Sequence, residues 1–178
     1  MVDKAPLKFF EKLIATPSPS GFETGAQRVW ADYVKPHCDE FTTDAYGNAF
    51  ARLGEQSKRP HVVLAGHIDE LGFMVSHLNE DGFLFVQGIG GIDRALFRGQ
   101  RVHVHGPKGT IAGVTGSLAI HLQEPDDRKK VPDLHEMYID IGAGSKAEAE
   151  KLVRVGDSIT YADGFERLQN QRVAARGC

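Results

Sequence analysis

Apolar and polar residues follow a helical period at the start of the chain. Between residues 7 and 34 the apolar positions recur every three or four residues, which predicts two amphipathic helices, the first at about 7–14 and the second ending near Pro36. A proline-rich segment separates the two helices. Beyond it, Ser20 and Glu23 have the spacing of a capping box, so we expect the Ser20 hydroxyl to cap the second helix.

The residues that follow favour β-structure. Apolar-rich runs at 41–45 and 49–53 flank the turn-forming Tyr46-Gly47-Asn48, which predicts a β-hairpin. The uninterrupted non-polar run from Val62 to Gly66 predicts a central strand that is buried on both faces. Two polar side chains come directly after this run, at the carboxyl end of the strand, where open α/β sheets carry their chemistry.

From about residue 70 onward, short strands alternate with turn residues. We expect strands at 72–78, 83–87, 100–105, 110–115, 137–141 and 157–161. This number and spacing favour a compact barrel or sandwich. Ser145 and Glu148 have the spacing of a second capping box and predict a short helix before the last strand. The chain is therefore expected to be an α/β protein with an inserted β unit.

Composition and charge exclude several classes of protein. With 178 residues, 41% of them apolar, the chain can bury a real core, and it lacks the run of about 18 apolar residues that a membrane helix needs. The net charge of -3 gives no general attraction to nucleic acid or to an anionic membrane. Cys38 and Cys178 are too few for a disulfide framework or a cysteine-based zinc site. Because no secretory signal is recognisable, we expect a cytoplasmic protein.

The polar pair after the apolar run is His67 and Asp69. In an extended segment residues i and i+2 share a face, so the carboxylate can hold the imidazole while the other ring nitrogen faces a metal. A lone His-x-Asp pair is more often structural than metal-binding. The buried strand before the pair and the apolar strand after it favour the metal-binding interpretation here.

Other candidate groups carry weaker signals. His103 and His105 share a strand face and could bind a metal, but two polar residues on an exposed face explain them more simply. His121 lies in a loop that could reach a site or a partner. Ser117 lacks the Gly-x-Ser-x-Gly motif around it, which argues against a serine hydrolase.

Five motifs together closely resemble the tetrahedral and glutamyl aminopeptidase family of metallo-aminopeptidases, some members of which carry the name endoglucanase. The motifs are Pro17 to Glu23, Thr43 to Asn48, Gly66 to Phe73, Gly99 to Val102 and Tyr138 to Ala143. The resemblance implies a zinc-peptidase-like α/β catalytic domain, interrupted by a PDZ-like β-barrel domain used in dimerisation. It also implies peptide substrates, and homo-oligomers that range from dimers to hollow dodecamers.

The same resemblance implies a role for each residue of the polar pair. His67 would be a ligand of one of two zinc or cobalt ions, and Asp69 would serve catalysis as the carboxylate that orients it. Residues 1–69 would form the first part of the catalytic domain, 70–163 the dimerisation domain, and 164–178 the return to the catalytic domain.

In this family the sequence continues beyond the position of Cys178 and supplies a bridging aspartate, a glutamate base, further acidic ligands and a last histidine. We therefore expect the chain to correspond to an N-terminal half that is inactive alone and has the missing half among its partners. We also expect 164–178 to bury too little surface for stable order. A non-catalytic assembly module acting through the β domain is the alternative. A glycosidase is a weaker one, because we find no pair of carboxylates placed to flank a sugar bond.

Overall fold

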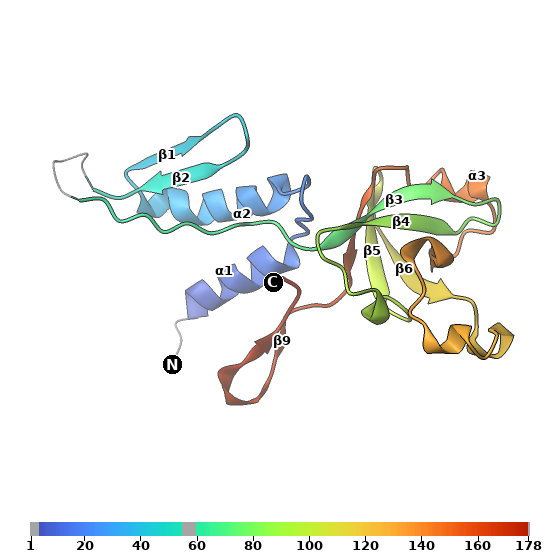
Figure 1. Ribbon diagram of the computed structural model, residues 1–178. Coiled ribbons are helices and arrows are strands. Elements are labelled where there is room, and N and C mark those ends of the chain that lie inside the picture. Colours follow the sequence, from blue (N-terminus) through green and yellow to red (C-terminus); the bar gives the residue numbers. More distant parts are fainter. Residues whose placement is uncertain (1–3, 55–59, 178) are drawn as a thin grey trace.

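A computed structural model describes residues 4–54 and 60–177 (Figure 1). The first part of the chain consists of helices α1 (Lys4–Ala15) and α2 (Thr24–Val34) and the antiparallel hairpin of β1 (Glu40–Thr43) and β2 (Ala49–Arg52). The helices pack through the stacked rings of Phe9 and Tyr33, whose centroids are 3.7 Å apart. Both predicted helices and the predicted hairpin are confirmed.

The start of α2 differs from the expectation. Glu23 precedes the helix without capping it through its side chain, and its carboxylate accepts the backbone N–H of Gly21. The Ser20 hydroxyl donates to Asp69, 49 residues away in the chain. The predicted capping box is therefore wrong, because the hydroxyl satisfies a carboxylate in place of a helix terminus.

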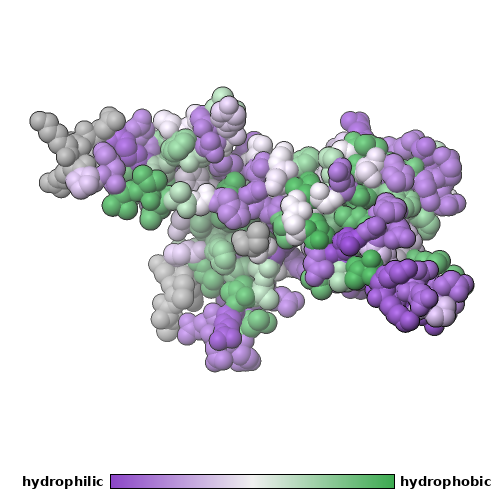
Figure 2. Space-filling model, viewed as in Figure 1, coloured by the Kyte–Doolittle hydropathy of each residue, from purple (hydrophilic) through white to green (hydrophobic). Residues whose placement is uncertain are grey.

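The largest difference concerns the predicted strand at 61–66. These residues form no strand, and Val62, Val63 and Leu64 are 88%, 82% and 95% exposed. Figure 1 shows the segment running from the hairpin to β3 (Gly72–Leu78), and Figure 2 shows apolar atoms along it. The prediction of a buried central strand is wrong for this chain. The described strands β1 and β2 pair with each other, and none of the described strands pairs with the segment.

Six antiparallel strands close into a barrel in the second part of the chain, in the order β3-β4-β7-β6-β5-β8. The strands after β3 are β4 (Leu84–Ile89), β5 (Arg101–Gly106), β6 (Gly109–Ser117), β7 (Met137–Asp140) and β8 (Ser158–Tyr161). Each lies within two residues of its predicted range. The expected α/β fold class is confirmed, and the β unit is a barrel and not a sandwich.

The barrel interior holds the hydrophobic core. On β5, Val102 and Val104 alternate with outward-facing residues and are fully buried. Phe73 on β3 packs edge-on against Phe97 and Tyr161, with ring centroids 4.9 and 5.4 Å away. Alternation of inward and outward residues thus places the apolar side chains of β5 in the core, whereas β3 departs from it at a register shift between Val75 and His77.

Short helical segments connect the strands. Helix α3 (Lys146–Ala149) begins after Ser145, whose hydroxyl accepts the backbone N–H of Glu148, so the predicted cap at Ser145 is confirmed. The 3-10 turns are η1 (Lys35–His37), η2 (Arg94–Leu96), η3 (Ile120–Leu122), η4 (Asp127–Lys129), η5 (Leu134–Glu136) and η6 (Gln169–Gln171). None of the helices in the described part of the chain has the length and apolarity that a membrane crossing requires.

After β8 the chain returns to the helices. A small hairpin pairs β9 (Glu166–Arg167) with β10 (Val173–Ala174), and Figure 1 shows the chain ending beside α1. The side chain of Arg176 is 9% exposed, so this segment buries more at its end than the sequence suggested. Cys178 lies outside the described residues.

Candidate functional site

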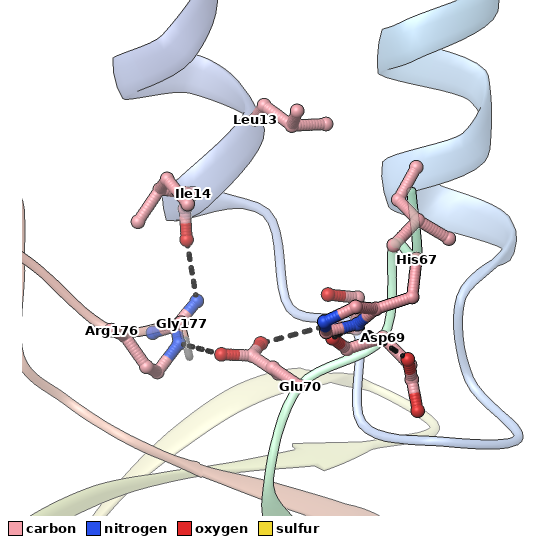
Figure 3. Close-up of a pocket in the computed structure, with 9 residues that line it drawn as sticks. Leu13, Ile14, His67, Asp69, Glu70, Arg176 and Gly177 are labelled. Carbon is pink, nitrogen blue, oxygen red and sulfur yellow. Dashed lines mark hydrogen bonds and ion pairs between the residues drawn. The ribbon is translucent and has the colours of Figure 1, made fainter. Parts of the chain in front are cut away.

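A pocket of about 120 Å³ lies between the end of α1 and the segment that leads into β3 (Figure 3). Its walls come from three segments that are far apart in the sequence. The polar lining residues are Ser18, His67, Asp69, Glu70 and Arg176. The two residues that the sequence singled out therefore share a pocket with three that it did not.

His67 and Asp69 are in direct contact. The imidazole Nδ1 lies 2.9 Å from Asp69 Oδ1 and 3.1 Å from the backbone oxygen of the same residue. Both oxygens are acceptors, so we assign the proton to Nδ1, and Nε2 has no hydrogen-bond partner among the described residues. The imidazole is 64% exposed. The contact expected from the spacing is present, although the segment that carries it is not a strand.

Asp69 is held on its other side by Ser20. The Ser20 hydroxyl donates to Asp69 Oδ2. This bond lowers the pKa of Asp69, partial burial opposes the shift, and the contact with His67 adds to it. Asp69 is therefore ionised at neutral pH and accepts a hydrogen bond from each neighbour. Sequence reasoning missed Ser20 as a partner of Asp69, because its spacing to Glu23 suggested a helix cap.

Glu70 and Arg176 form a buried ion pair beside this contact. Their side chains are 6% and 9% exposed, and Arg176 Nε lies 2.7 Å from Glu70 Oε2. The second oxygen of Glu70, Oε1, accepts the backbone N–H of Ser18 at 2.8 Å. Sequence reasoning missed this pair as well, since its members are 106 residues apart and no local pattern links them.

The side chains in the pocket supply only part of the ligand set that a metal ion requires. A catalytic zinc takes three protein ligands, and a two-metal site needs protein ligands for each of its two ions. His67 offers Nε2, whereas every carboxylate oxygen of Asp69 and Glu70 already accepts a hydrogen bond from the protein. Among these three side chains, only His67 has a ligand atom without a hydrogen bond, and the described residues of the pocket do not form a group of three side chains that could hold a metal.

A second group of potential ligands has a structural explanation. Within residues 4–54 and 60–177, the side chains close enough to share an ion are Asp133, His135 and Glu136, and all three are exposed. Glu136 accepts the backbone N–H of Asp133, and Asp133 pairs with Arg94. The acidic members thus cap the turn η5 and bind an arginine, which accounts for their proximity.

The remaining candidate histidines lie away from the pocket. His105 contacts the hydroxyls of Thr110 and Thr160 through its two ring nitrogens, at 3.2 and 3.0 Å. Burial lowers the pKa of His105 to about 4, and the positive charges of His103 and Arg176 add to the effect. It is thus a half-buried barrel residue, not an exposed one. His121 is exposed in η3.

Comparisons with known proteins identify relatives among the aminopeptidases. Residues 47–178 match the M42 glutamyl aminopeptidase family. The lysyl aminopeptidase of Pyrococcus furiosus is 34% identical to this chain, over 94% of this chain and 49% of its own length. The crystal structure of a TET aminopeptidase from a marine sediment archaeon of the Thaumarchaeota has a TM-score of 0.89 and 36% identity. That match covers 96% of this chain and 48% of the archaeal chain.

Solved relatives also form large assemblies. The TET1 peptidase of Pyrococcus horikoshii, 32% identical with a TM-score of 0.84 over 96% of this chain and 51% of that one, can assemble into a tetrahedron or a large octahedral shell. Another related structure holds a dodecamer. This chain spans about half the length of the relatives that it matches.

Proposed function

The chain belongs to the M42 glutamyl aminopeptidase family, and from this premise we propose that it supplies part of the active site of a metallo-aminopeptidase, which hydrolyses N-terminal residues from peptides. The contact between His67 and Asp69 carries the proposal. An ionised carboxylate that holds Nδ1 leaves Nε2 for a metal, which is how metal-bound histidines are commonly oriented.

We assign His67 as a ligand to one of two divalent metal ions, zinc or cobalt, and Asp69 as the catalytic carboxylate that orients it. In the complete site the ions would activate a water molecule and polarise the scissile carbonyl. The described residues contribute orientation: Asp69 keeps the proton on Nδ1 of His67, and Ser20 keeps Asp69 in place.

The remaining ligands are proposed to come from the half of the enzyme that this chain does not cover. The exposed apolar run at 62–64 supports this, because such a run is typical of a central strand whose neighbours are absent. On this proposal, residues 1–69 and 164–178 belong to the catalytic domain, and 70–163 form the inserted domain.

The test is peptide hydrolysis with and without the missing half. The 178-residue chain alone should release no measurable amino acid from a chromogenic aminoacyl substrate with added zinc or cobalt, because one imidazole cannot hold a catalytic metal. Supplying the C-terminal half, from the sequence encoded downstream or from a close relative, should restore turnover. In the restored enzyme His67→Ala should abolish turnover, and Asp69→Asn should lower it by roughly 10- to 100-fold.

His135→Ala is the matched control, because His135 belongs to the exposed ligand group outside the pocket. Its loss should leave metal uptake and turnover unchanged. Turnover by the 178-residue chain alone that depends on His67 would contradict the expected inactivity. Restored turnover that survives His67→Ala would overturn the ligand assignment. No metal uptake in any combination would favour the alternative, a non-catalytic assembly module.

We also propose that the barrel mediates self-association of this chain. The related peptidases form closed assemblies, and a loop of the barrel exposes Leu118, Ile120 and Leu122 by 56%, 67% and 63%. Neighbouring exposed apolar side chains are typical of protein interfaces. Light scattering should show a dimer or larger species, and Leu118→Asp with Ile120→Asp should shift it towards monomer. A strict monomer at high micromolar concentration would contradict this.

A further inference from the structure

Arg176 connects three elements beside the His67–Asp69 contact. In addition to its ion pair with Glu70, its guanidinium donates to backbone carbonyls of two elements. Nη1 donates to Tyr161 at the end of β8, at 3.0 Å, and Nη2 donates to Ile14 near the end of α1, at 3.1 Å. The arginine thus joins the first helix, the last barrel strand and the segment that carries the candidate site.

The contact with α1 caps the C-terminus of that helix. The last carbonyls of a helix have no partners within it, and the helix dipole makes this end favour a cation. Nη2 of Arg176 contacts the carbonyl oxygens of both Ile14 and Ala15, the latter at 3.4 Å. The helix end is therefore held by a residue 161 positions further along the chain.

Glu70 links Arg176 to the segment that carries the His67–Asp69 contact. It follows Asp69 in the chain and is tied twice to Ser18, because Oε1 accepts the Ser18 N–H at 2.8 Å and the Glu70 N–H donates to the Ser18 carbonyl at 2.9 Å. Two residues later, Ser20 donates to Asp69. Segments 18–20 and 69–70 are thus held side by side, and Figure 3 shows the guanidinium on the side of Glu70 away from His67.

We propose that Glu70 and Arg176 are a positioning pair, whose ion pair fixes the segment on which Asp69 holds the His67 imidazole protonated at Nδ1. The inference rests on the proposed function for the importance of His67, but it concerns the geometry of the metal-free chain. Arginine suits this role better than lysine, because its planar fork has five donors and here contacts one carboxylate and three carbonyls.

The test reads the His67 tautomer by ¹⁵N NMR of histidine-labelled protein, at a pH where the ring is neutral and without metal or substrate. The unaltered chain should show the proton on Nδ1. Arg176→Met leaves the Glu70 charge buried and unpaired, so it should remove this preference and accelerate amide exchange at residues 67–70 by at least about tenfold. Glu70→Gln should act in the same direction.

Two further variants separate positioning from general effects. Arg176→Lys keeps the charge but has fewer donors, so it should restore part of the Nδ1 preference that Arg176→Met loses. Arg167→Met is the matched control, because Arg167 lies in the same returning segment and its ion pair with Glu11 is exposed, at 64% and 47%. This control should change neither the tautomer nor the exchange.

Two results would overturn the proposed positioning role of Glu70 and Arg176. An unchanged His67 tautomer in both Arg176→Met and Glu70→Gln would overturn it. Equal acceleration of exchange at Val102 to Val104 in the barrel core would also overturn it, because that would show a general loss of stability. If Arg176→Met does not fold, Arg176→Lys and Glu70→Gln are judged by the same two criteria. If none of the three variants folds, the ion pair is needed for folding and the proposal fails. A failed hydrolysis test would leave this result unaffected.

Discussion

Apolar residues are buried in the barrel and exposed in the segment that leads into it. The whole hydrophobic core cluster lies between Phe73 and Ile159. Among the described residues before the barrel, the buried apolar side chains are those of Pro19, Ala26 and Ala31, whereas the three apolar residues at 62–64 are almost fully exposed.

The difference follows from the number of neighbours that each segment has. A closed barrel gives every strand two neighbours and encloses the inward-facing side chains, so its apolar residues are buried within a single chain. Residues 61–66 have the composition of a buried strand, but no described strand pairs with them. Burial is therefore a property of the surroundings and not of the apolar run.

Phe73→Ala should have the largest effect on stability. Its ring is fully buried against Phe97 and Tyr161, so truncation should lower the free energy of unfolding by about 3–5 kcal/mol. Val63→Ala is the matched control, since it also truncates an apolar side chain but at an 82% exposed position, and it should stay within about 0.5 kcal/mol. Urea unfolding followed by circular dichroism measures both. Equal losses would show that residues 61–66 are packed in solution.

A smaller effect on stability is expected from pH, and its source is His105 in the barrel. Burial lowers the pKa of folded His105 to about 4, whereas an unfolded histidine titrates near 6.5. As the pH falls, the unfolded chain takes up this proton first. The contribution of neutral His105 to stability is therefore complete above about pH 6.5 and is lost as the pH falls towards 4.

His105→Gln tests this pH dependence, because glutamine keeps hydrogen-bonding capacity but does not titrate. Urea midpoints measured between pH 7 and 4.5 should decline less steeply in this variant than in the unaltered chain. His121→Gln, at an exposed histidine, should leave the slope unchanged. An identical decline in all three proteins would rule out His105 as its source.

The smallest effect is expected in the β1–β2 hairpin. Arg52 pairs with Glu40 across the two strands, and the two side chains are 38% and 50% exposed. Solvent and salt weaken such a pair, so Glu40→Gln should lower the free energy of unfolding by less than about 1 kcal/mol. The difference from the unaltered chain should shrink further at high salt. A loss comparable to that of Phe73→Ala would mean that the hairpin is more buried in solution than in the structure.

Features that depend on neighbouring residues were predictable from the sequence. An apolar-rich run bounded by turn residues located β3 at its observed bounds, and the spacing of Ser145 and Glu148 marked the start of α3. The contact between His67 and Asp69 was predictable for the same reason, because residues i and i+2 meet without help from the rest of the fold.

Features that depend on distant residues were not predictable. Ser20 bonds to Asp69 across 49 residues, and Arg176 pairs with Glu70 across 106. A hydroxyl or a guanidinium can satisfy many partners, so local spacing cannot choose among them, and for Ser20 it indicated the wrong one. By itself the sequence determined which segments become helices and barrel strands and which histidine meets a carboxylate. Only the tertiary structure decided which apolar runs are buried and which groups hold that carboxylate, because both depend on the segments that the fold brings together.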